Sequence, residues 1–167
     1  MTDLMYLPKA DVGFVGNWGG HVRVQATPEN QGNVVMPVVP MSYYFGDQNG
    51  TVFLKTSVYG NPKWPVVKTG VKVLNPSSVE FKVDSICSSC TPSVRQQEIT
   101  RLTLVDKQHL NAHCYIYAAF SDGSHTELTY EGTLHLLTPD ELAAIDREVT
   151  QNGKLLTQIN SKIPVNN

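Results

Sequence analysis

The sequence predicts an all-β fold, an eight-stranded antiparallel up-and-down barrel followed by a C-terminal helix. From residue 18 to residue 136, short segments that alternate polar and apolar residues are separated by turn signals. A strong helix start follows at residue 138. Short strands at this spacing, joined mostly by tight turns, are typical of a sandwich or a barrel and not of alternating strands and helices.

The turn signals between the predicted strands are specific. Asn49-Gly50 predicts a two-residue hairpin, because both central positions of that turn need positive φ. A second hairpin crosses Asn75-Pro76-Ser77-Ser78. Residues 1–15 have no clear period, and we expect a loop or short turn placed to cover a barrel end. The predicted strands are 18–26, 36–45, 51–59, 66–74, 79–86, 98–105, 109–120 and 125–136. Pro37 and Pro40 reduce the first half of the second strand to an edge or irregular segment.

The C-terminal helix has the clearest local signals. Thr138 is the expected N-cap, Pro139 the first helical residue and Glu141 the partner in a capping box. One apolar face follows at helical spacing, formed by Leu142, Ile145 and Val149. Asn152-Gly153 predicts a stop, with a weaker second helix after it. We therefore expect a single domain, with an N-terminal loop at 1–15, the barrel at 16–137 and a helical segment at 138–163.

Composition excludes several classes of protein. The 167 residues carry a formal charge of -2, which argues against a nucleic-acid binder. Hydrophobic residues at 41% and charged residues at 17% exclude a disordered chain. No stretch approaches the ~20 apolar residues of a membrane helix. Residues 1–20 lack an intact secretory signal, which favours a soluble cytoplasmic protein as the chain is written, or a periplasmic or secreted one if a signal has been removed.

The predicted strands have two different faces. In 109–120, one face carries Leu110, Cys114 and Ile116, and the other carries His113 and Tyr117. In 125–136, the apolar residues likewise alternate with His125, Glu127, Glu131 and His135. The simplest interpretation is that the polar faces meet solvent, as antiparallel sheets allow. The alternative is a wide barrel that carries a few of these groups inward.

Three cysteines are present, at positions 87, 90 and 114. Cys87 and Cys90 form a lone C-x-x-C at the end of a predicted strand, followed by Thr91-Pro92. A structural zinc site needs a second pair of ligands, and a thioredoxin-type pair should open a helix. A structural disulfide, an oxidisable loop pair and inert thiols all remain open, with redox or metal chemistry as the remaining alternative.

Gly16-Asn17-Trp18 opens the first predicted strand, and here the sequence resembles the lipocalin group of calycin-type barrels, whose first strand begins with Gly-x-Trp. The resemblance covers these three residues, the strand count and the C-terminal helix. It implies that Trp18 is structural and plugs the closed end of the barrel. In that family the Trp usually packs beneath an Arg from a late strand, and 128–136 contains no Arg.

Signatures of cofactor and catalytic chemistry are weak. The haem barrels of the nitrobindin type also begin with Gly-x-Trp, and a haem would need an axial histidine such as His109, His113, His125 or His135. The chain has no G-x-S-x-G and no H-E-x-x-H motif. His109 and His113 share a strand face at a spacing of about 13 Å, too far to share one metal. We predict no catalytic residue, no metal and no cofactor.

The leading hypothesis is non-catalytic binding of a small, largely apolar molecule in the barrel, since about eight strands can enclose one small ligand. An alternative is an enzyme that uses an inward His113 with a carboxylate such as Glu131. Another is an interaction or assembly protein that uses the strand edge at 36–45 or the C-terminal helix. The ligand and the oligomeric state, including a homo-oligomer, are left open. The predicted lining residues are Tyr44, Phe53, Phe81, Tyr117 and Tyr130, and because their positions differ in strand parity, not all of them can face inward.

Overall fold

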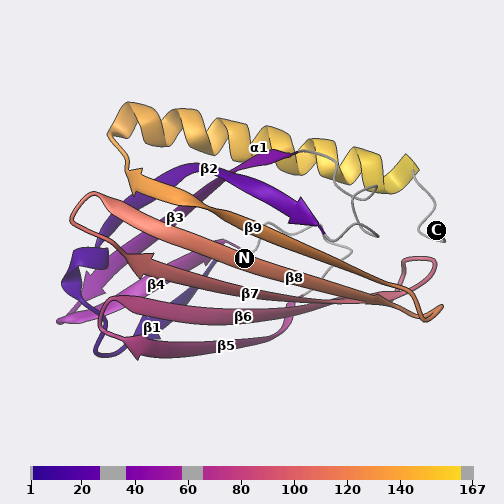
Figure 1. Cartoon of the computed structure of the whole chain (residues 1–167), viewed down its shortest axis with the longest axis horizontal. Coiled ribbons are helices and arrows are strands. Elements are labelled where there is room, and N and C mark those ends of the chain that lie inside the picture. Colours follow the sequence, from indigo (N-terminus) through magenta and orange to yellow (C-terminus); the bar gives the residue numbers. More distant parts are fainter. Residues whose placement is uncertain (1, 27–36, 58–65, 163–167) are drawn as a thin grey trace.

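The computed structural model describes residues 2–26, 37–57 and 66–162 (Figure 1). In this part of the chain, nine strands form one antiparallel sheet that curls into a nearly closed barrel, and one helix follows. The predicted fold class is therefore confirmed, with one strand more than expected. The strands are β1 (Thr2–Leu7), β2 (Gly16–Ala26), β3 (Val38–Gln48), β4 (Thr51–Ser57), β5 (Val66–Asn75), β6 (Ser78–Cys87), β7 (Val94–Leu104), β8 (His109–Phe120) and β9 (His125–Leu136). Residues 36, 58, 59 and 163 of the predicted elements lie outside the described residues.

The sheet order β1-β4-β3-β2-β9-β8-β7-β6-β5 shows how the barrel closes. β2 to β4 and β5 to β9 are two up-and-down meanders, and they are joined by the antiparallel pairing of β2 with β9. The interval between β4 and β5 is occupied by β1, which pairs with β4 and contacts β5. The loop expected at 1–15 is thus wrong for its first half. The pattern is hard to recognise because only Met5 and Leu7 face the core, too few to establish a period.

One end of the barrel, which we call the closed end, is covered by the short 3-10 helix η1 (Val12–Phe14). Asp11 begins η1 by accepting a hydrogen bond from the Gly13 amide at 2.7 Å, and its own amide donates to Pro76 O in the turn that follows β5. The Trp18 indole Nε1 donates to Phe14 O at 2.7 Å, and both rings are fully buried. Trp18 is therefore part of the closed end, where η1 lies at the left of Figure 1.

The predicted hairpins form where the turn signals place them. Asn49 and Gly50 both have positive φ, 54° and 83°, and join Gln48 directly to Thr51. Pro40 lies in β3 opposite His21 of β2. In the part of the chain that the structure describes, β4 pairs only with residues 44–48 of β3. Pro40 thus occupies a stretch with a single strand partner, where a missing N–H donor is tolerated.

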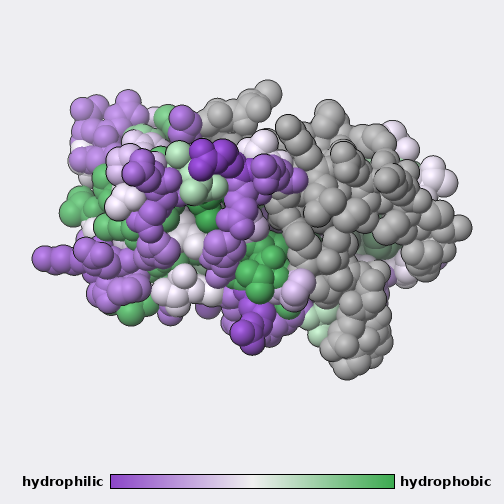
Figure 2. Space-filling view, turned by 90° about the horizontal axis from the view of Figure 1, so that it is seen from above, coloured by the Kyte–Doolittle hydropathy of each residue, from purple (hydrophilic) through white to green (hydrophobic). Residues whose placement is uncertain are grey.

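Helix α1 (Pro139–Lys162) lies along the outer wall over β2 and β3 (Figure 1). The capping box is present: Thr138 N donates to Glu141 Oε1 at 3.0 Å, and Glu141 N donates to Thr138 Oγ1 at 3.2 Å. Ile145 is the buried residue of its apolar face. The exposed side of the described helix residues is largely hydrophilic in the view from above (Figure 2).

The expected stop at Asn152-Gly153 is wrong, since one helix continues to Lys162. A glycine within a helix costs only about 1 kcal/mol relative to alanine, which does not suffice to end it. Among the helices in the described part of the chain, none has the length and apolar character needed to cross a bilayer.

Candidate functional site

The solvent exposure of the inward side chains differs between the two ends of the barrel. At the closed end, large apolar side chains are fully buried. These are Leu7, Trp18, Val22, Phe45, Val52, Leu54, Val79, Leu102, Leu110 and Leu134. At the opposite end, which we call the open end, Cys87, Val94 and Ala118 are buried, but several other inward side chains keep part of their surface accessible. These are Val24, Ala26, Val83, Ser85, Gln96, Glu98, Ile116, Thr126 and Leu128.

The strand register assigns these inward positions. Val79 faces Leu102, Leu102 faces Ala112, and the same ladder continues through Glu98 and Ile116 to Leu128. Because side chains of a strand alternate between faces, residues in line with buried Leu102 point into the barrel. The partial exposure of Val83, Glu98, Ile116 and Leu128 indicates that solvent reaches the barrel interior from the open end.

A polar cluster lies inside the barrel between the closed end and the open end, and we call it the lumen site. It consists of Glu98 and Thr100 of β7, Cys114 of β8 and Tyr130 of β9. Cys114 lies opposite both Thr100 and Tyr130 in the ladders. Its thiol donates to Glu98 Oε1 at 3.3 Å. Three adjacent strands therefore bring a carboxyl, a hydroxyl, a thiol and a phenol to one patch of the inner wall.

Burial controls the protonation of the lumen site. Desolvation raises the pKa of Glu98, although the Cys114 hydrogen bond opposes this shift. Desolvation, and then the charge of Glu98, raise the pKa of Cys114 far above that of a free thiol. The pKa of the Tyr130 phenol is also raised, first by burial and then by the charges of the neighbouring Cys114 and Glu98. A thiol that holds its proton is a poor nucleophile, so the cluster is suited to hydrogen bonding and ion pairing.

Thr100 has an unusual position in this cluster. Its side chain is fully buried and Oγ1 makes no hydrogen bond of good geometry, although the Cys114 thiol opposite it lies close enough for the Thr100 hydroxyl to act against the rise in the pKa of that thiol. It lies on the same strand face as Glu98, two residues and about 7 Å closer to the closed end. A buried polar group without a partner is costly, and such groups are uncommon in native proteins.

The inner wall near this cluster is free of positive charge in the part of the chain whose side chains the structure describes. Every Lys, Arg and His of the strands there lies on the outward face by register. Arg101 pairs with Glu80 at 2.9 Å on the outside, and Arg95 lies 3.9 Å from Asp84. Asp84 is itself buried, but it is on the outward face of β6, opposite Lys68 in the ladder.

The five predicted lining residues divide between the two faces. Phe81 and Tyr130 point inward, and Phe81 contacts Tyr43 across the barrel at a ring distance of 6.1 Å. Tyr44 and Phe53 lie on the outer wall, where the Phe53 ring packs between Tyr6 and Tyr44. Tyr117 is also outside, stacked on His125 at 5.5 Å. In this register only Phe81 and Tyr130 of the five can line the barrel, because the other three lie at outward positions.

The histidines of the strands lie on the outward face of the barrel. His113 Nε2 is 3.6 Å from Glu131 Oε1, but both side chains are half exposed on the outward face, so the inward acid–base pair of the enzyme alternative is not formed by them. His21 contacts Glu148 at 2.9 Å, and His135 contacts Glu141 at 3.3 Å. These last two pairs join β2 and β9 to α1.

Sequence reasoning missed Glu98 and Thr100, although a signal was present. Both residues share parity with Leu102 and Leu104, so they belong to the apolar face of their strand. The predicted strand began at residue 98, which placed Glu98 at its end and concealed the pattern. β7 in fact begins at Val94, and Glu98 lies in its middle.

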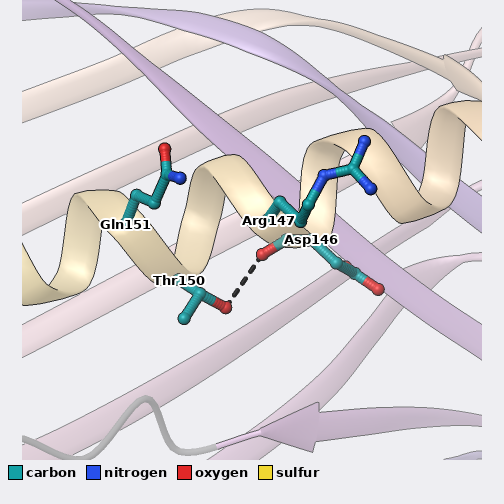
Figure 3. A pocket seen from close by; sticks show the side chains of 4 residues that line it. All are labelled: Asp146, Arg147, Thr150 and Gln151. Carbon is teal, nitrogen blue, oxygen red and sulfur yellow. Dashed lines mark hydrogen bonds between the residues drawn. The ribbon is translucent and has the colours of Figure 1, made fainter.

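A shallow groove lies beside α1. Asp146, Arg147, Thr150 and Gln151 line it, and all four are exposed (Figure 3). The Thr150 hydroxyl donates to Asp146 O at 2.9 Å, which satisfies that group within the helix. The groove holds no enclosed polar group among these four residues, so it is a weaker candidate than the lumen site.

The C-x-x-C sequence forms a disulfide between Cys87 and Cys90. Cys87 is fully buried and packs with Val94, Ala118 and Phe120, which fixes the connection between β6 and β7 at the open end. The structure thus selects the disulfide from the alternatives that the sequence left open.

No group of three or more His, Cys, Asp or Glu side chains able to hold a metal ion occurs among the residues with described positions. The candidate site is therefore the patch of four polar residues inside the barrel. In comparisons with known proteins, no family model, no curated protein and no solved structure matches this chain.

Proposed function

We propose that the protein binds a small, largely apolar molecule in the open half of the barrel, without covalent chemistry. The observation that carries the proposal is that many inward side chains at the open end, apart from the buried Cys87, Val94 and Ala118, stay partly accessible, whereas the large apolar ones at the closed end are fully buried. An apolar wall with a few convergent polar groups is the usual composition of a small-molecule site. The lumen site supplies those polar groups.

The proposal includes a lipocalin-like character for the barrel. It is supported by the position of Trp18 at the closed end and by the helix on the outer wall. The ninth strand, β1, and its place between β4 and β5 depart from a simple up-and-down barrel.

The first test is native mass spectrometry of the purified protein beside its denatured mass. We expect additional mass that is lost on denaturation, or, for ligand-free protein, saturable binding of the neutral dye Nile red. A pair of variants on adjacent residues of β9 locates the dye. Leu128 faces inward and Thr129 outward, and both are half-buried.

Leu128→Trp should fill the open half and reduce Nile red binding at least tenfold, whereas Thr129→Trp should bind like the unchanged protein. Circular dichroism establishes that both variants are folded. Equal binding by the two variants, or neither bound mass nor dye binding in the unchanged protein, would contradict a site inside the barrel.

A further inference from the structure

We infer that the molecule bound in the barrel is an organic cation, an apolar amine whose ammonium group pairs with the Glu98 carboxylate. This inference rests on the proposed function and specifies its ligand class. Three features of the described inner wall support it: the position of Glu98, the absence of a compensating positive charge, and the buried hydroxyl of Thr100, which makes no hydrogen bond of good geometry.

Glu98 has apolar neighbours in its ladders. Val83 of β6 and Ile116 of β8 lie directly opposite it, so its polar contact comes from the Cys114 thiol at 3.3 Å. A thiol is a weak donor and stabilises a carboxylate poorly. An ionised carboxylate in such surroundings is costly unless it is paired with a positive charge and hydrogen-bonded.

The protein supplies no such charge from the described strands. Arg95 and Arg101 of the same strand, and Lys82 of the neighbouring strand, all lie on the outward face. Within the described residues, therefore, either the ligand supplies the positive charge or Glu98 stays protonated. An ammonium ion satisfies the carboxylate directly, and the Tyr130 ring offers a second favourable surface through cation–π attraction.

Thr100 extends the site toward the closed end. Its buried Oγ1 is an unused acceptor on the same face as Glu98. An ammonium group carries three N–H donors and can use both oxygens, if the ligand or a water molecule spans the distance between them. A carboxylate ligand, in contrast, would meet Glu98 as a like charge and would find no cation on the described wall.

A matched series of eight-carbon ligands tests the inference: octylammonium, 1-octanol and octanoate, titrated by calorimetry at pH 7.5. We expect octylammonium to bind at least tenfold more tightly than 1-octanol, and octanoate to bind more weakly than both. Glu98→Gln should reduce octylammonium affinity at least tenfold and leave 1-octanol affinity unchanged. Glu131→Gln, the same change on the outward face of β9, should alter neither.

The outcomes separate this inference from the proposed function. Binding of 1-octanol without a preference for octylammonium, or octylammonium affinity that Glu98→Gln does not change, overturns the cation and retains a binding barrel. Tighter binding of octanoate than of octylammonium also overturns it. No binding by any of the three ligands overturns both the inference and the proposed function.

Discussion

Glu98 and Thr100 lie on the face of β7 that packs the core, although both side chains are polar. The other residues on that face include Val94, Leu102 and Leu104, which bury apolar surface at the two ends of the strand. Buried polar groups with weak partners or none lower stability, and the proposed ligand would offset this cost by pairing with them.

The protonation of Glu98 should make stability depend on pH. Because burial raises its pKa above 4.5, the folded protein holds this proton to higher pH than the unfolded chain does. The contribution to stability is complete below pH 4.5 and is lost as pH rises through the raised pKa of the folded state. The titratable groups facing it are Cys114 and Tyr130, which keep their protons in this range.

We expect the free energy of unfolding of the unchanged protein to fall between pH 4.5 and pH 8 relative to that of Glu98→Gln. Urea unfolding at several pH values measures this difference without ligand. Parallel pH profiles for the two proteins would show that Glu98 is not desolvated in the folded state.

At the scale of elements, the pairing of β2 with β9 joins the two meanders, and it depends on a close approach at Gly132. A Cβ atom at this position would lie 2.9 Å from Val22 Cγ1 and 3.0 Å from both His21 O and Val22 Cα. Two of these three are backbone atoms, which cannot move without separating the strands.

Gly132→Ala should therefore lower the free energy of unfolding by about 1–3 kcal/mol, the usual cost of an overpacked core. Gly70→Ala is the matched control, because a Cβ there meets nothing within 4 Å. Chemical unfolding should show little loss for that variant. A similar loss for both glycines would mean that the close approach at Gly132 is not the cause.

At the scale of the whole molecule, β1 completes the barrel wall between the two meanders. Its inward residues Met5 and Leu7 join the main core, while Leu4 and Tyr6 face outward. The Tyr6 hydroxyl donates to Gln48 at 2.8 Å, which ties the outer side of β1 to the end of β3. Without β1, the core would be open to water between β4 and β5.

Two leucines of β1 test this role. Leu7 is 1% exposed and Leu4 is 44% exposed. Leu7→Ala should lower the free energy of unfolding by about 2–5 kcal/mol, whereas Leu4→Ala should change it by less than about 0.5 kcal/mol. Urea unfolding of both variants measures the difference. Equal and small effects would show that β1 is not part of the cooperative unit.

The sequence by itself determined the locally encoded features. The alternation in 109–120 and 125–136 predicted the correct inward faces, because strand side chains alternate whatever the partner strand is. Asn49-Gly50 predicted its turn through backbone sterics, and Thr138 and Glu141 predicted the helix start through hydrogen bonds within four residues.

Only the tertiary structure decided which distant segments meet. β1 becomes recognisable as a strand only through its pairing with β4, in which Thr2 lies opposite Ser57. These two residues are 55 positions apart in the sequence. The inward position of Glu98 depends on where β7 begins, which its ladders with β6 and β8 fix. The lumen site joins residues of three strands, and its electrostatics arise from burial that no local pattern encodes. Sequence periodicity is a property of a single strand, whereas closure and desolvation are properties of the assembled barrel.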